Sequence, residues 1–141
     1  MLDGLARYLA DAGFGVYRTT GTYSPDEVAI TTDYRPASPD RMVTLTQYAG
    51  STSDSGLGVD EPRVQIRVRG TSDPAWSRQH AQAIYDALHG LARVTLPDGT
   101  YVVLAVCQGS GPAYLGQDSN DRHEHVLNVA VAVSNPNRRG R

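Results

Sequence analysis

The spacing of apolar residues along the chain predicts two helices. Near the amino end, apolar side chains recur at intervals of three and four residues, as on the buried stripe of a short amphipathic helix: Leu2, Leu5, Ala6 and Leu9. A second, longer stripe comprises Trp76, His80, Ile84, Leu88 and Leu91. Asp73 suits the N-cap of this second helix, Pro74 suits its first position, and Gly90 can end it.

Runs of alternating or β-branched residues predict strands at 28–34, 42–48, 63–69, 93–96, 101–107 and 122–133. Asp98-Gly99 separates two of these runs and indicates a hairpin. The run at 101–107 is apolar on both faces, which predicts a central strand covered on both sides. Segments 49–62 and 108–121 lack periodicity and predict long loops.

These elements predict an α+β fold, in which one long and one short helix pack on a mostly antiparallel sheet of about five to six strands. We expect a single domain at 1–134, followed by a basic C-terminal tail at 135–141. The near-neutral charge of −2 argues against a surface that attracts nucleic acid as a whole. No apolar run approaches the length of a membrane span and no secretory signal is visible, so we expect assembly in a cytoplasm.

The chain carries no recognisable catalytic or phosphate-binding motif, so we expect a protein that is not an enzyme and has no cofactor. The single cysteine, Cys107, is expected to be a small buried apolar residue. His123 and His125 share one strand face and are weak candidates for a metal site, with a third ligand needed from elsewhere. The alternative is a polar strand entrance with both histidines near solvent.

Three arginines on one predicted strand indicate a basic surface. Arg63, Arg67 and Arg69 alternate with buried positions and would form a positive stripe on one strand face. Such a stripe could bind phosphate or an acidic partner, or its charges could pair with carboxylates on neighbouring strands. The two predicted loops supply further interface candidates: Ser53, Asp54, Leu57, Asp60, Tyr114 and Asp118.

An ordered set of fragments resembles a known family. These fragments are GVY at 15–17, PD at 39–40, VTLT at 43–46, VQIRVRG at 64–70, DP at 73–74, AIYDALHG at 83–90, PAYLGQD at 112–118 and RHE at 122–124. The set, which covers roughly residues 2–133, is similar to the tail terminator or minor capsid family of siphophages, of the type found in actinobacterial phages and prophages. The family pattern contains no catalytic motif.

The resemblance implies a structural virion protein at the head-proximal end of the tail. It would form a ring, expected to be a hexamer, that caps the tail tube, ends tube polymerisation and joins the tail to the head or neck. Its partners would be further copies of itself, the tail tube protein and a neck or head-completion protein. Genomic DNA would pass through the ring without sequence-specific recognition, and no membrane would be involved. The alternatives are a head-completion protein on the capsid side and a binding module outside the virion.

Overall fold

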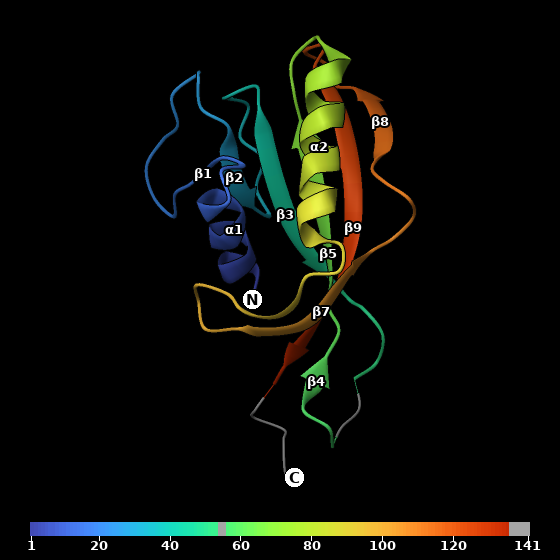
Figure 1. Cartoon of the computed structure of the whole chain (residues 1–141). Coiled ribbons are helices and arrows are strands. Elements are labelled where there is room, and N and C mark those ends of the chain that lie inside the picture. Colours follow the sequence, from blue (N-terminus) through green and yellow to red (C-terminus); the bar gives the residue numbers. More distant parts are fainter. Residues whose placement is uncertain (54–55, 136–141) are drawn as a thin grey trace.

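The computed structural model describes residues 1–53 and 56–135. Two helices and nine strands follow one another along the chain (Figure 1). Their bounds are α1 (Leu2–Asp11), β1 (Val16–Tyr17), β2 (Ala29–Thr32), β3 (Met42–Tyr48), β4 (Val59–Asp60), β5 (Arg63–Arg69), α2 (Pro74–Leu88), β6 (Ala92–Thr95), β7 (Tyr101–Cys107), β8 (Ala113–Gln117) and β9 (His123–Ser134). The α+β class and both helices agree with the sequence-based expectation.

The strands form one mixed sheet in the order β1-β2-β3-β5-β9-β7-β6, with β4 and β8 also paired to β9. The pairs β1–β2 and β2–β3 are parallel, and the remaining pairs are antiparallel. The prediction of five to six mostly antiparallel strands was therefore wrong in number and incomplete in direction. The additional strands β1, β4 and β8 have only two to five residues, too few to show a period in the sequence.

Strand β9 is the spine of the sheet. With twelve residues it is long enough to pair with β5 and β4 on one side and with β8 and β7 on the other. The segment 108–121, expected to be a loop, contains β8 because Tyr114 pairs with His125 along this edge. The segment 49–62, also expected to be a loop, contains β4 because Val59 pairs with Ser134. Both departures have one cause, since a long neighbouring strand supplies hydrogen-bond partners that the local sequence does not reveal.

Both helices lie on the same face of the curled sheet, and β7 bends round in front of it (Figure 1). Helix α1 packs on β1, β2 and β3, whereas α2 packs on β5, β7 and β9. The core between them is built from fully buried side chains of both helices and of the central strands, which include Leu5, Leu9, Leu45, Val64, Ile66, Val68, Ile84, Leu88 and Val129. Each such side chain contributes about 1.5–3 kcal/mol by leaving water.

Helix α2 begins and ends as the sequence predicts. The Asp73 side chain accepts a hydrogen bond from the Ala75 backbone amide at 3.0 Å, and Pro74 occupies the first turn. Beyond the last helical residue, Gly90 takes a φ of 85°, a left-handed conformation that favours glycine. Leu91, the last residue of the predicted stripe, therefore lies past the helix, although it still packs against the core.

Candidate assembly surfaces

The arginines of β5 occupy a different environment from the exposed stripe that their alternation predicts. Arg69 is only 4% exposed. Its guanidinium donates to the backbone carbonyl oxygens of Pro36 at 2.8 Å, Pro39 at 2.8 Å and Asp40 at 3.0 Å. Burial, together with two neighbouring arginines, lowers the pKa of Arg69 from its ordinary value. The expectation that Arg69 is presented to a partner is thus wrong for this structure, because the loop at 33–41 folds over it.

A buried carboxylate occupies the centre of the same region. Glu124 on β9 is 5% exposed and accepts two hydrogen bonds of 3.2 Å from Arg67, and it also pairs with Arg35. Arg122 pairs with Asp118 at 2.8 Å. For Arg67 the structure therefore shows the alternative arrangement, in which its charge pairs with a carboxylate on the neighbouring strand β9. We call Arg67, Arg69, Arg122 and Glu124 the arginine clamp.

The arginine clamp fixes the loop between β2 and β3. Besides the three carbonyls bound by Arg69, the Ala37 carbonyl accepts from Arg122 at 2.5 Å. Arg35 is held at the other end of the loop by Glu124. Charge-assisted hydrogen bonds of this kind are stronger than neutral ones. The clamp therefore gives this loop a fixed shape, and Tyr34, at its start, projects from it with 71% of its surface exposed.

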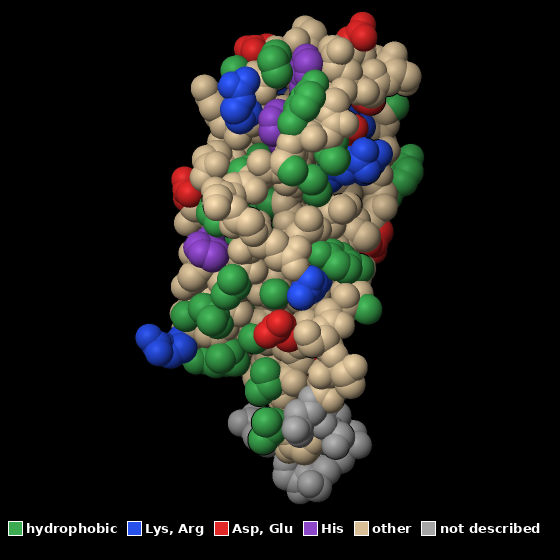
Figure 2. Space-filling view, turned by 90° about the vertical axis from the view of Figure 1, so that its right-hand side faces the viewer, with side chains coloured by type: hydrophobic (Ala, Val, Ile, Leu, Met, Phe, Trp, Pro, Cys, Tyr) green, Lys and Arg blue, Asp and Glu red, His purple; other side chains and the backbone are tan. Residues whose placement is uncertain are grey.

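Strand β7 departs most clearly from expectation. It was predicted to be covered on both faces, but four of its apolar side chains are between 38 and 42% exposed: Tyr101, Val103, Leu104 and Val106. The pairing of β7 with β9 shifts register between Val102 and Leu104, so two consecutive side chains, Val103 and Leu104, face outward. Figure 2 shows hydrophobic side chains gathered on the lower part of this side of the molecule. Both helices lie on the inner face of the sheet, so the outer face of β7 stays open.

Next to β7 the outer face of the sheet is hollowed. A groove of about 360 Å³ is lined by Glu61, Arg63, Leu104, Val106, Cys107, Gln108, Ala130 and Ala132, and we call it the outer groove. The small side chains of Ala130 and Ala132 lie between the larger ones of β7 and Arg63. The Nε atom of Arg63 is buried and has no hydrogen-bond partner among the described residues. An apolar groove with a cation at its rim is typical of a protein contact surface.

The two histidines of β9 make separate contacts. His123 Nδ1 lies 2.7 Å from the Tyr114 hydroxyl, and His125 Nδ1 lies 2.8 Å from the Ser77 hydroxyl. Desolvation, and then the charge of Arg78, lower the pKa of His125. Among the described residues, no three histidine, cysteine or acidic side chains come together in a way that could hold a metal ion. His125 is only 5% exposed, so the expectation that both histidines lie near solvent is wrong for this residue.

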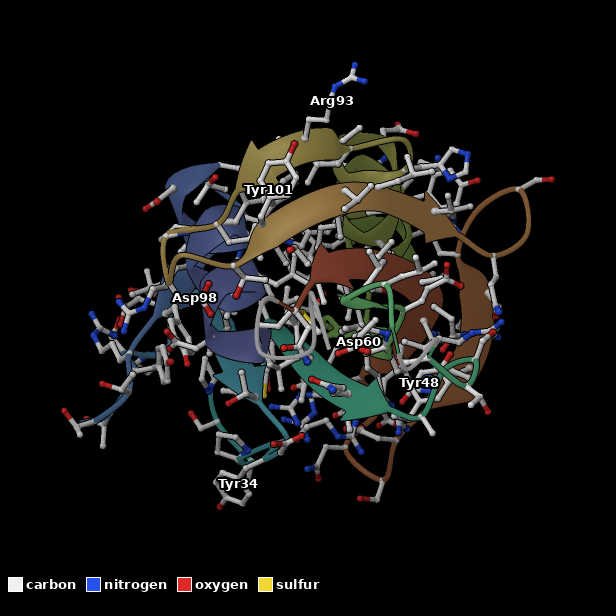
Figure 3. The ribbon with its side chains drawn as sticks, turned by 90° about the horizontal axis from the view of Figure 1, so that it is seen from below. Tyr34, Tyr48, Asp60, Arg93, Asp98 and Tyr101 are labelled. Atoms are coloured by element: carbon white, nitrogen blue, oxygen red, sulfur yellow. The ribbon has the colours of Figure 1, made fainter. Side chains whose placement is uncertain are left out.

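The loop candidates are scattered over the surface. Ser53, Asp60 and Tyr48 line a hollow of about 760 Å³, and Figure 3 shows Asp60 and Tyr48 near each other in the view from below. Asp60 also accepts a hydrogen bond of 2.9 Å from Asn135. Leu57 is exposed, whereas Asp118 is engaged by Arg122. Asp54 lies outside the described residues, as does the predicted basic tail from residue 136 onward.

Cys107 lies at the end of β7 and is buried, as expected for a small apolar residue. Burial raises the pKa of its thiol to about 11. The sulfur is therefore protonated at neutral pH and has little of the thiolate that a nucleophile needs.

Fixed loops, an open apolar strand face and a groove are features typical of proteins that contact other proteins. In the described part of the chain, no helix combines the length and the apolar character needed to cross a bilayer. A family model described as bacteriophage tail terminator protein matches residues 8–135. The chain therefore belongs to the bacteriophage tail terminator family, a family of structural rather than enzymatic proteins. No curated protein matches the chain.

Two surface features were not predicted from the sequence. The β7 face was missed because a continuous apolar run was interpreted as buried, and the projection of Tyr34 was missed because it depends on the arginine clamp.

Proposed function

We propose that this protein forms a ring on the last ring of the tail tube, ends tube polymerisation there and presents the surface that joins the tail to the head. The observation that carries the proposal is the match to the tail terminator family over nearly the whole chain. The open β7 face and the outer groove support it, because a protein that assembles needs an apolar surface that its own fold leaves uncovered.

Within this proposal, residues 1–134 act as one unit that contacts neighbouring copies, and the ring surrounds the path of the DNA. Ring contacts between identical copies are heterologous, so two different surfaces of each copy meet. The partners would be further copies, the tube protein and a neck protein, and the site of action would be the head-proximal end of the virion tail. A hexamer is the expected ring.

The structure changes which side chains we assign to the contact. Arg63, at the rim of the outer groove, stays an interface candidate. Arg69 binds the protein's own loop directly, and Arg67 binds Glu124, which also pairs with Arg35 of that loop. We therefore propose that both arginines act on assembly only through the shape of the loop. Ser53, Leu57, Asp60 and Tyr114 remain candidates for contact with the tube or the neck.

The test is electron microscopy of lysates from a phage in which this reading frame is stopped early. Overlong, unattached tails beside full, tailless heads would support the terminator role. Tails of normal length beside empty or leaking heads would move the protein to the capsid side of the neck. Normal infectious particles would refute a role in assembly, and mass spectrometry of purified particles would then show whether the protein belongs to the virion at all.

A further inference from the structure

Two exposed features lie on opposite sides of the molecule. Figure 3, which looks along the long axis from below, shows Tyr34 on one side and Tyr101 and Arg93 on the other. Tyr34 is the most exposed of the large apolar residues, and Tyr101 belongs to the open β7 face. Features placed on opposite sides of one copy suit a head-to-tail contact between copies.

The Tyr34 loop and the outer groove differ in shape. Tyr34 projects from a loop, whereas the outer groove is a hollow bordered by Leu104 and Val106 with alanines between its walls. A tyrosine ring buries a large area with few rotatable bonds, which is why tyrosines so often anchor protein contacts. The arginine clamp fixes the loop beforehand, so little conformational freedom is lost when the ring is bound.

Each feature also has one exposed charged side chain beside it, and these two charges are opposite in sign. Asp33 precedes Tyr34, and Arg93 lies on β6 next to the β7 face. Both side chains are exposed, and neither has an ion-pair partner in the part of the chain that the structure describes. Both residues hold an unusual positive φ, 66° for Asp33 and 54° for Arg93, so each local backbone is held in a less common conformation.

We propose that Tyr34 of one copy packs against the outer groove and β7 face of the next copy, with Asp33 facing Arg93 across the contact. The occupant of the apolar face is thus a second copy of this chain. Because the Tyr34 loop and the outer groove are different surfaces, an open series of bound copies leaves one Tyr34 loop free at one end and one groove free at the other. Both are occupied only when the series closes into a ring. The proposal rests on the proposed ring function and names the surfaces that build the ring.

A charge exchange tests the pairing. Asp33→Arg and Arg93→Asp are each expected to reduce the ring population at least tenfold, because each places like charges across the contact. The double variant Asp33→Arg/Arg93→Asp is expected to restore rings, because the opposite charges then meet again. Asp11→Arg, an equal charge change on the exposed end of α1, is the control and is expected to leave rings intact. Assembly is measured by negative-stain microscopy and by tail length in complemented phage.

Cross-linking keeps the proposal testable if the charge variants fold poorly. In a Cys107→Ser background, Ala37→Cys on the Tyr34 loop and Thr95→Cys on β6, both exposed positions beside the proposed contact, are placed in the same chain and treated with a short bis-maleimide in assembled particles. We expect a ladder of covalent oligomers up to the full ring, and only dimers when the two single variants are mixed. Dimers from Thr95→Cys alone would overturn the proposal in favour of a face-to-face contact.

Failure of this inference is distinguishable from failure of the proposed function. Absence of cross-links in particles whose tails depend on this protein for their length would overturn the assigned surfaces and leave the terminator role intact. Normal tails in the stop-codon phage would refute the terminator role itself.

Discussion

Replacing Arg69 by methionine tests whether this arginine holds the fold or binds a partner. Methionine keeps much of the apolar stem but removes all three hydrogen bonds to the carbonyls of Pro36, Pro39 and Asp40. Hydrogen bonds from a charged group contribute about 1.5–3 kcal/mol each, so the three sum to roughly 5–9 kcal/mol. The loop at 33–41 can relax and recover water as partner for some of its carbonyls.

We therefore expect Arg69→Met to lower the free energy of unfolding by about 3–5 kcal/mol, less than the full sum because the relaxed loop and water recover part of the lost hydrogen bonding. At about 4 °C per kcal/mol, this corresponds to a fall in Tm of roughly 12–20 °C. Removal of the Arg69 charge also leaves Glu124 with two arginines nearby, Arg35 and Arg67, so that carboxylate stays paired.

The assay is urea denaturation of the purified protein followed by tryptophan fluorescence, since Trp76 packs against the core. Arg93→Met is the matched control, because Arg93 is exposed and the same side-chain change there is expected to cost less than about 0.5 kcal/mol. An Arg69→Met protein as stable as the control, yet unable to cap tails, would refute the structural assignment and return Arg69 to the interface.

Three further predictions concern the core, an exposed ion pair and the thiol. Ile84→Ala should lower the unfolding free energy by about 2–5 kcal/mol in urea titrations, because Ile84 is fully buried, whereas the exposed Gln79→Ala on the same helix should change it little. An unchanged midpoint for Ile84→Ala would contradict the packing of α2. Hydrogen bonds from Arg18 and the Ser24 amide lower the pKa of Glu27 to about 2, so this group stabilises the fold above its ordinary pKa and loses that contribution as the pH falls towards 2. Carboxyl NMR should show a midpoint near 2 that rises in Arg18→Met, and a midpoint unaffected by that change would count against the pair. Cys107, with a pKa of about 11, should react with a disulfide reagent at pH 8 only after unfolding, and a fast reaction of the native protein would show that the thiol is accessible.

Local sequence patterns were sufficient to predict much of the fold. The alternation at 63–69 placed Val64, Ile66 and Val68 in the core, and the bounds of β5 agree with it. Asp73, Pro74 and Gly90 marked the ends of α2 correctly, and Asp98-Gly99 marked the β6–β7 hairpin. These signals are strong because caps, turns and side-chain periods are set by the local backbone, whichever partner the element later finds.

Only the tertiary structure decided what covers the strand face that points away from the core. A period of two says that Arg67 and Arg69 face away from the core, but a loop brought from 33–41 determines that Arg69 is enclosed. A run of apolar residues says that β7 is stable as a strand, but the placement of both helices on the inner face leaves Leu104 open. The sequence by itself determined both helices, the longer strands, the family and much of the core. Exposure depends on segments distant in the chain, so the surfaces through which copies can meet were decided by the way the sheet curls and by what the loops cover.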